Sequence, residues 1–346
     1  MSSPYLLFLL KQNNGKALWT YSTKSPGLSN SVDTTVNSLI NLGINAKSVI
    51  VSDRNGVDKI LREEKPTHAI IEAFWVTPGK LQLLKHLHPQ IHFIIRNHSE
   101  VPFLAMEGMA FTWICEYLKM GVEVTNVSTR TVSDLKPIVH QLGVNSNLLT
   151  YLPNIYRADF TPFHIKHMPK HDIHIGCFGA VRPMKNHVEQ ALAAIDYGNK
   201  TNRQVYFHIN ATRVEGDGSQ PLKNLRGLFQ RLPNAELIEH GWMTKTEFHH
   251  LLHDKIDLLL QCSLTESFNI IAADAVLTGV PVVASPEIRW LNSFHHCDPL
   301  SVKSIVEQIM KIFRSPADLK YYLRSQSKQL FDYNQKAAFT WSKRFC

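Results

Sequence analysis

Closely spaced cysteines are missing from the sequence. The five cysteines are scattered along the chain with no Cys-x-x-Cys pair: Cys115, Cys177, Cys262, Cys297 and Cys346. A disulfide framework needs a higher cysteine density, and a zinc cluster needs paired ligands, so neither is expected. Unpaired cysteines are typical of a reducing compartment, and we therefore expect a cytoplasmic protein.

Long apolar runs are missing as well. The first apolar stretch, residues 5–10, follows no basic region and leads directly into polar residues. It predicts a first β-strand rather than a signal peptide. No run approaches the roughly 20 apolar residues of a membrane-spanning helix, so no transmembrane segment is expected. The chain also shows no internal repeat.

Length and patterning predict two α/β domains. The 346 residues, 44% of them apolar, suffice for two separate cores. Strand-like segments alternate with helix-like segments, which predicts mostly parallel sheets with helices on both faces. The expected strands are residues 5–10, 48–51, 68–71, 92–95, 122–126, 204–209, 235–239, 256–260 and 280–284, and the second half opens with the apolar segment 172–179. In the first half, the expected helices are residues 31–42, 57–64, 79–87 and 102–120.

We expect the following domain boundaries. An N-terminal Rossmann-like domain spans residues 1–160, and a linker spans residues 161–171, where prolines and histidines occur without an apolar period. A second Rossmann-like domain spans residues 172–330. The final segment, residues 331–346, is expected to be an aromatic helix.

Charge points to an anionic partner. The net charge is +8, with 18 histidines beside it, and no single basic run accounts for it. Nucleic acid, an acidic glycan, an anionic membrane face or a nucleotide would each fit. A generally basic surface without a specific partner is the alternative.

The most informative segment is residues 265–284, where Glu266 and Asp274 flank a strand-to-helix junction. Apolar blocks at residues 256–260 and 280–284 predict buried parallel strands, so Glu266 should lie at the carboxyl end of a strand, where open α/β sheets bind ligands. The amides of Ser267, Phe268 and Asn269 should lie near a helix N-terminus, which favours phosphate. The alternative is an ordinary crossover whose acids are a cap and a solvated face.

Three other segments carry candidate binding residues. Residues 176–186 form a glycine-containing turn after a strand, and Arg182 and Lys185 offer cations there for a diphosphate; two solvated cations are the alternative. Residues 25–31, with Gly27, are expected to be a loop before a helix or a plain helix cap. Trp242 follows a strand and is a candidate core aromatic.

Residues 265–284 resemble the signature of retaining glycosyltransferases of family 4. That signature reads Glu-Gly-Phe-Gly, a short apolar stretch, Glu-Ala and Gly-x-Pro-Val-Val. The matching residues are Glu266, Phe268, Ala275, Gly279, Pro281, Val282 and Val283. The departures are Ser267 and Asn269 in place of the glycines and Asp274 in place of the second Glu.

The resemblance implies a role for each matching position. Glu266 would lie beside the donor sugar, and Asp274 would hold the ribose of the nucleotide. Lys185 matches a family lysine, while Ala180 occupies the place of a family arginine, for which Arg182 would substitute from two residues away. His98 follows a buried strand and matches a family histidine that contacts the donor sugar, and Arg96 or Glu100 would orient it or bind the acceptor.

The resemblance also implies the GT-B architecture, in which two Rossmann-like domains face each other across a cleft, the first on the acceptor side and the second binding the nucleotide sugar, with the last helix crossing back to the first domain. It places the Gly27 loop near the donor phosphates and Trp242 at the nucleobase pocket. The implied reaction is transfer of a sugar from a nucleoside-diphosphate sugar with retention. Residues 72–76 and 98–105 are similar to glycosyltransferase-like proteins of tailed bacteriophages. The predicted acceptor is a hydroxymethylated base of phage DNA, in a host cytoplasm. The alternatives are a surface polysaccharide or lipid-linked glycan, and a catalytically silent protein that binds nucleotide or DNA.

No cofactor or metal is expected, apart from the nucleotide sugar as co-substrate. Glycosyltransferases of the other major architecture hold a divalent ion with an Asp-x-Asp pair, which this chain does not contain. Residues 295–298 have ligand-type side chains, but neighbours in sequence rarely reach a single ion. The sequence leaves the oligomeric state open.

Overall fold

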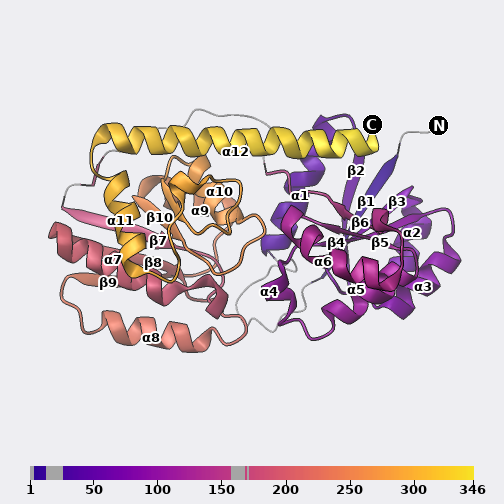
Figure 1. The fold of residues 1–346 in the computed structure, drawn as a ribbon, viewed down its shortest axis with the longest axis horizontal. Coiled ribbons are helices and arrows are strands. Elements are labelled where there is room, and N and C mark those ends of the chain that lie inside the picture. The colour runs from indigo at the N-terminus through magenta and orange to yellow at the C-terminus, as the bar shows by residue number, and fades with distance from the viewer. Residues whose placement is uncertain (1–3, 13–25, 157–167, 170) are drawn as a thin grey trace. The chain divides into compact units, whose positions relative to one another are not determined.

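The computed structural model describes residues 4–12, 26–156, 168–169 and 171–346. The chain divides into two units (Figure 1). Unit 1 comprises Met1–Ala158 and Tyr333–Cys346, and unit 2 comprises Asp159–Asp332. The predicted linker, residues 161–171, lies largely outside the described residues.

Unit 1 contains a parallel six-stranded sheet with the order β2-β1-β3-β4-β5-β6. The order reverses between β1 and β3, and doubly wound sheets bind ligands at the carboxyl ends of the strands beside such a reversal. The strands are β1 (Tyr5–Lys11), β2 (Asn45–Val51), β3 (His68–Glu72), β4 (His92–Asn97), β5 (Glu123–Asn126) and β6 (Leu149–Tyr151).

Alternation along β1 explains why both faces of this sheet are covered. Leu6 and Phe8 belong to a buried cluster with residues of α1 and α12, whereas Leu7 and Leu9 belong to a second cluster with residues of α2, α3, α5 and α6. The helices of unit 1 are α1 (Pro26–Asn41), α2 (Val57–Glu64), α3 (Pro78–Leu87), α4 (Val101–Leu104), α5 (Ala110–Lys119), α6 (Thr129–Leu142) and the 3₁₀ turn η1 (Ser146–Leu148).

Unit 2 contains a parallel five-stranded sheet with the order β11-β10-β7-β8-β9. Its reversal lies between β7 and β10, so the loops after these two strands meet at one edge of the sheet. The strands are β7 (Asp172–Cys177), β8 (Gln204–Asn210), β9 (Ala235–His240), β10 (Leu258–Gln261) and β11 (Val282–Ala284).

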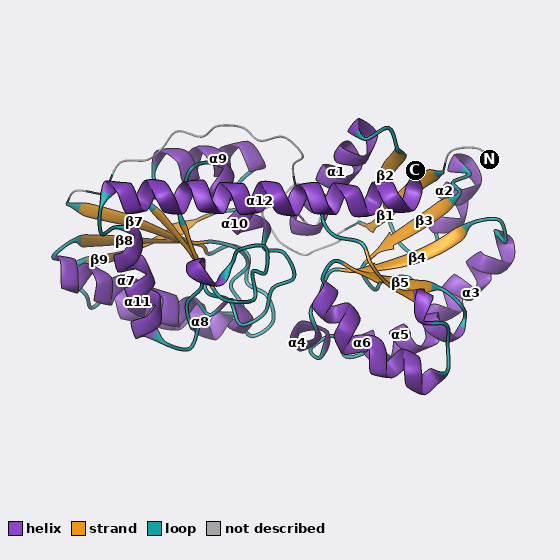
Figure 2. Cartoon of the chain, turned by 45° about the horizontal axis from the view of Figure 1, so that its top comes forward, coloured by secondary structure: helices purple, strands orange, loops and turns teal. Residues whose placement is uncertain are grey.

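Helices cover both faces of the unit 2 sheet (Figure 2). Residues of α7, α8 and α11 share a buried cluster with β7, β8 and β10, and α9 and α10 lie on the opposite face. The helices are α7 (His187–Thr201), α8 (Ser219–Phe229), α9 (Lys245–Asp254), α10 (Ile270–Leu277) and α11 (Val302–Ile312), with the 3₁₀ turns η2 (Pro183–Lys185) and η3 (Ser293–His295).

The last helix, α12 (Pro316–Phe345), contributes to both units. In unit 2, Gln326 forms two hydrogen bonds with the backbone of Val282 on the edge strand β11, at 3.1 and 2.6 Å. In unit 1, Trp341 is fully buried, and its Nε1 atom donates to the Pro153 carbonyl at 2.8 Å. Within the described residues, no helix has the length and apolar character needed to cross a membrane.

The predicted α/β class with two Rossmann-like sheets is confirmed, but two helices differ from expectation. Residues 102–120 form two helices, α4 and α5, because the chain turns through residues 105–109. Helix α1 begins at Pro26 rather than at Ser31, since proline is well tolerated in a first helical turn. The predicted loop with Gly27 is therefore the first turn of a helix, and Ser31 lies inside the helix rather than capping it.

Candidate functional site

Two loops of unit 2 bring a lysine and a glutamate into contact. Lys185 ends the turn after β7, and Glu266 lies in the loop after β10. The Nζ atom of Lys185 lies 2.5 Å from Oε1 of Glu266, and the side chains are only 11% and 9% exposed. The reversal of strand order explains this contact, because β7 and β10 are neighbours in the sheet although they are distant in sequence.

The loop after β7 depends on two residues with positive φ. Gly179 has φ of 116°, and its amide donates to the Asn210 side chain at 3.0 Å. Asn186 has φ of 58° and holds the loop to its neighbours by donating to the carbonyls of Cys262 and Pro299, at 3.1 and 2.7 Å. The loop that carries Lys185 is thus fixed at both ends.

Two cations lie close to the start of α7. His187 is buried, and this burial together with the charges of Lys185 and Arg182 lowers its pKa to about 3. Arg182 also forms an ion pair with Glu215 at 3.5 Å. Arg182 therefore contributes to the positive potential of this region while its guanidinium is engaged by a carboxylate.

The loop after β10 ends at the N-terminus of α10. Asn269 has φ of 64°, and its side-chain oxygen accepts from the Ala272 amide at 2.8 Å. Its amide group donates to Gln261 at 2.8 Å. Asparagine is one of the few residues that tolerate this backbone conformation, so Asn269 keeps the shape that a glycine would allow and adds a helix cap.

Phe268 and Ser267, which precede Asn269, differ in their burial. Phe268 is buried, its ring centroid lies 6.1 Å from that of Trp290, and its carbonyl accepts from the Trp290 Nε1 atom at 2.7 Å. Ser267 is partly exposed. The amides of residues 267–269 therefore precede α10 as the sequence predicted, while the Phe268 ring belongs to the core.

Asp274 and Trp242 have partners within unit 2. Asp274 on α10 is 5% exposed, and its Oδ1 atom lies 2.6 Å from Nε2 of His249 on α9. Trp242 is partly exposed, and the guanidinium carbon of Arg213 lies 5.2 Å from its ring centroid. His249 and Arg213 carry no motif of their own, so the sequence analysis did not identify them.

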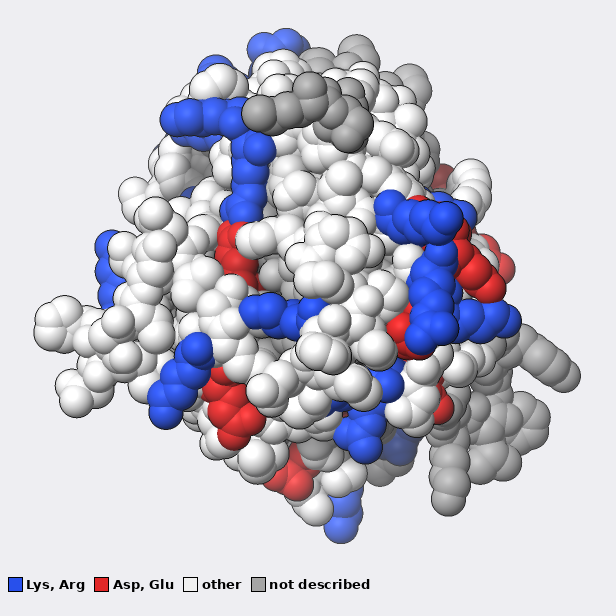
Figure 3. Space-filling view, turned by 90° about the vertical axis from the view of Figure 1, so that its right-hand side faces the viewer, with Lys and Arg blue, Asp and Glu red and all other residues white. Residues whose placement is uncertain are grey.

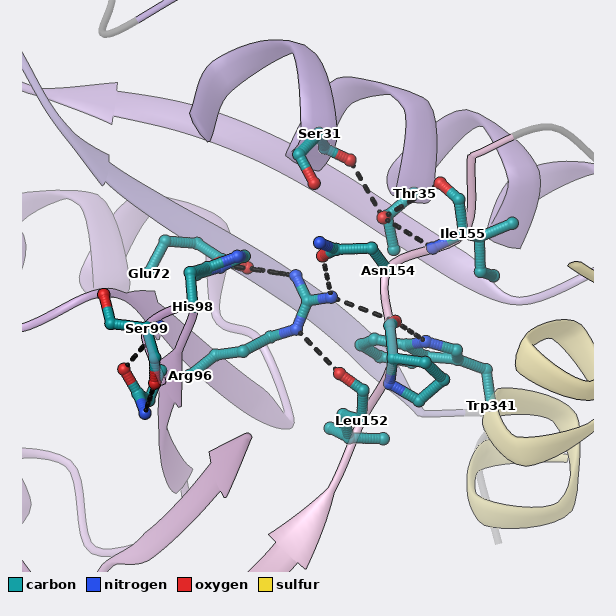
Figure 4. Close-up of polar contacts among 12 residues, drawn as sticks. Ser31, Thr35, Glu72, Arg96, His98, Ser99, Leu152, Asn154, Ile155 and Trp341 are labelled. Carbon is teal, nitrogen blue, oxygen red and sulfur yellow. Dashed lines mark hydrogen bonds and ion pairs between the residues drawn. The ribbon is translucent and has the colours of Figure 1, made fainter. Parts of the chain in front are cut away.

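In unit 1, His98 lies at the end of β4 beside a buried ion pair. Its Nε2 atom contacts Oε2 of Glu72, the last residue of β3, and Arg96 lies 3.1 Å from the other oxygen of the same carboxylate (Figure 4). The sequence suggested that Arg96 and Glu100 orient His98 or bind the acceptor. In the structure, Arg96 binds Glu72, which in turn contacts His98, and Glu100 accepts a hydrogen bond from Thr131 at 2.7 Å.

The structure thus groups the predicted residues within each unit. Unit 2 brings together Lys185, Glu266 and the start of α10, and unit 1 contains His98. Gly27 lies in the first turn of α1, and the preceding Ser25 lies outside the described residues.

No metal cluster accompanies these groups: in the part of the chain that the structure describes, no three His, Cys, Asp or Glu side chains could hold an ion. The ligand-type residues 295–298 have other contacts. His295 lies 2.9 Å from Ser325, and the sulfur of Cys297 lies 3.3 Å from that of Cys262.

Solved structures of glycosyltransferases share this fold. Sucrose-phosphate synthase from Thermosynechococcus elongatus has a TM-score of 0.71 at 12% identity, covering 99% of this chain and 98% of that chain. UDP-forming α,α-trehalose-phosphate synthase from Burkholderia xenovorans has a TM-score of 0.66 at 9% identity, covering 98% of each chain. HepE from Anabaena, in complex with UDP and glucose, has a TM-score of 0.64 at 14% identity, covering 98% of this chain and 100% of that chain.

These similarities, with the two parallel sheets, define the GT-B fold, in which two Rossmann-like domains form one protein. No protein-family model matches the chain, and no curated protein matches it. Because the identities are low, the comparisons establish the fold, and the activity has to be argued from the site.

Proposed function

We propose that the protein is a glycosyltransferase that moves a sugar from a nucleoside-diphosphate sugar to an acceptor. The observation that carries this proposal is the contact between Lys185 and Glu266 at the strand reversal of unit 2. It places a cation, a carboxylate and a helix N-terminus together in a fold that known glycosyltransferases share.

In the proposed mechanism, unit 2 binds the departing nucleotide. When the bond between the anomeric carbon and the diphosphate breaks, negative charge develops on the phosphate oxygens. Among the described residues, Lys185 donates a side-chain hydrogen bond only to Glu266, and an ammonium group has three donors, so two remain for phosphate. Lys185 and the amides before α10 would stabilise that charge.

The other residues would position the sugar and the nucleoside. Glu266 would bind hydroxyls of the donor sugar, and Asp274 with its partner His249 would bind the ribose. His98 would contact the sugar from unit 1. By resemblance to the family 4 signature, we propose that the product retains the anomeric configuration of the donor.

The donor to test first is a UDP-sugar. HepE binds UDP and glucose, and the Burkholderia enzyme forms UDP, so both handle this nucleotide. We also propose that transfer occurs in the cytoplasm and needs no divalent ion, because the sequence contains no Asp-x-Asp pair. Equal turnover with and without a chelator would support the second point, and loss of turnover with the chelator would contradict it.

The acceptor proposal rests on charge. The net charge of +8 favours an anionic acceptor, and the phage resemblance directs the first test to hydroxymethylated DNA. On the face shown in Figure 3, the drawn Lys and Arg side chains are interspersed with Asp and Glu. Binding to duplex DNA that weakens steeply with salt would support this acceptor, and no binding at low salt would redirect the search to surface glycans.

The activity itself is tested with a panel of nucleotide sugars, by measuring release of free nucleotide. We expect release by the wild type and loss of release in Glu266→Ala. Glu307→Ala is the matched control, since Glu307 is a 58% exposed residue of α11 in the same unit. Wild-type release no faster than that of Glu266→Ala would contradict the proposed activity, and the silent binding protein would then be the alternative to test.

A further inference from the structure

Unit 1 contains a network of charged side chains at the carboxyl ends of the inner strands β3 and β4. The proposed donor-binding residues of unit 2 do not account for it. Glu72 and Arg96 are both fully buried, and they are register partners on the adjacent strands β3 and β4. Their side chains meet at 3.1 Å, and Nε2 of His98 contacts the second carboxylate oxygen. Figure 4 shows Glu72 between the guanidinium and the imidazole.

Arg96 is held from its other side by groups far along the chain. Its guanidinium donates to the Leu152 and Pro153 carbonyls at 3.3 and 3.0 Å and to the Asn154 side chain at 2.8 Å. The Trp341 ring centroid lies 5.3 Å from the guanidinium carbon. These contacts fix the cation, and through it they fix the carboxylate of Glu72.

The network keeps Glu72 ionised despite its burial. Burial alone would raise the pKa of Glu72, but the neighbouring Arg96 and His98 lower it below its usual value. Burial lowers the pKa of His98, Arg96 lowers it further, and Glu72 opposes both effects. At neutral pH, the dominant state is therefore an ionised Glu72 beside a neutral His98.

The charge states determine the tautomer of His98. An ionised carboxylate only accepts hydrogen bonds, so the Nε2 atom that contacts Glu72 must carry the imidazole proton. The lone pair then lies on Nδ1, which has no hydrogen-bond partner among the described residues. The His98 side chain is 16% exposed whereas Glu72 is 0% exposed, so the ring connects the buried carboxylate with the surface.

The residue that follows Glu72 has a strained backbone conformation. Ala73, directly after Glu72, has φ of 66°, which is unusual for a residue other than glycine or asparagine. Its amide donates to the Arg96 carbonyl at 2.9 Å, so the turn is held against β4. Strain of this kind is typical of functional sites, where the surrounding structure maintains an unfavourable conformation.

We propose that Glu72 is a positioning residue, which holds His98 so that its Nδ1 atom accepts a hydrogen bond from a hydroxyl group of the sugar substrate, and that Arg96 holds Glu72. The proposal rests on the proposed glycosyltransferase function, but it adds residues and an atom-level role that the signature does not contain. If the network were purely structural, it would hold β3 and β4 to residues 152–154, and enzyme activity would not depend on the tautomer of His98.

The first test reads the tautomer without any substrate. In a ¹⁵N–¹H correlation spectrum of histidine-labelled protein, His98 is assigned by the signals that disappear in His98→Asn. We expect a protonated Nε2 and an unprotonated Nδ1 at pH 7. Glu72→Gln should remove this preference, because an amide both accepts and donates. A proton on Nδ1 of His98 in the wild type would overturn the proposal.

The second test separates positioning from stability. Glu72→Gln leaves the buried Arg96 charge without its partner and could fail to fold, so Glu72→Gln/Arg96→Met is made beside it to remove both charges. We expect kcat/KM to fall about 10-fold in the double variant and in His98→Asn, with no further loss when all three substitutions are combined. UDP affinity, which depends on unit 2, should not change.

The outcomes distinguish this proposal from the proposed function. A double variant with wild-type kcat/KM, beside an impaired His98→Asn, would show that Glu72 is structural only. If the wild type turned over no nucleotide sugar, the proposed function would fail, and the spectrum would still decide whether Glu72 sets the His98 tautomer.

Discussion

Lys185 and Glu266 lie 81 positions apart in sequence, yet their side chains meet at 2.5 Å. Each follows a central strand of the unit 2 sheet, one after β7 and the other after β10, and those strands are paired in parallel. The contact joins two motifs that the sequence shows separately. It is the basis of the proposed donor site.

Removing the Lys185 ammonium should weaken nucleoside-diphosphate binding. A hydrogen bond to a charged group typically contributes about 1.5 to 3 kcal/mol, so Lys185→Ala should cost that much for UDP and almost nothing for uridine. Calorimetry measures both. Lys200→Ala is the control, because Lys200 is 52% exposed and pairs with Asp196 on α7. Equal losses for UDP and uridine would make Lys185 structural.

Asn269 should be replaceable by glycine but not by alanine. Both variants lose the cap of α10 and the hydrogen bond to Gln261, but Asn269→Ala must also adopt positive φ with a side chain. Asn269→Gly adopts positive φ without strain and should therefore be about 1 kcal/mol more stable than Asn269→Ala. Urea denaturation measures the difference. Similar midpoints for the two variants would show that the backbone conformation at this position does not matter.

Stability should fall in mild acid because several buried histidines stay neutral in the fold. Burial is the main cause that lowers the pKa of His187 and His208 to about 3 and that of His68 to about 4. Below about pH 6.5, the unfolded chain gains protons that the folded chain does not, so unfolding becomes more favourable down to about pH 4.

We therefore expect Tm to decrease steadily between pH 6.5 and 4.5 in calorimetric scans. Each such histidine contributes up to about 1.4 kcal/mol per pH unit. His187→Gln should make the decrease shallower, whereas His253→Gln, at a half-exposed position, should leave it unchanged. A Tm that stays constant over this range would contradict the burial of these imidazoles.

The C-terminal helix should stabilise unit 1 through Trp341. This side chain is fully buried, and its ring centroid lies 5.9 Å from that of Phe8 on β1. Trp341→Ala should cost about 3 to 5 kcal/mol through the cavity that it leaves. Phe339→Ala removes an aromatic ring that is 69% exposed on the same helix and should cost little. Equal stability of the two variants would show that the helix end is not packed.

The sequence predicted the parts of the fold that depend on local pattern. Apolar blocks identified the strands other than the three-residue strand β6, which was not predicted, and the signature around Glu266 identified the loop after β10. Helix α6 was not predicted although it has a capping Ser128 and a terminal Gly143, and Pro137 lies inside it. A proline inside a segment disfavours a helix by local sequence criteria. Here the burial of Leu135 and Val139 in the core of unit 1 outweighs the cost of the proline.

The parts that were not predicted depend on pairing between strands. Glu72 lay in a segment with the phage resemblance, but no role was predicted for it from the sequence, because that role comes from the register that places it beside Arg96 on β4. The partner of Asp274, His249, lies on a different helix. The interpretation of residues 25–31 as a loop was wrong because clustered Ser, Asn, Gly and Pro are typical of turns, yet Pro26 begins a helix.

The most direct test of the donor site is a crystal structure of the protein with UDP. The account predicts that the diphosphate lies within hydrogen-bond distance of the Lys185 Nζ atom and of the amides of residues 267–269, with the ribose beside Asp274. A diphosphate bound elsewhere, or a nucleotide whose phosphates point away from Lys185 and the N-terminus of α10, would contradict it.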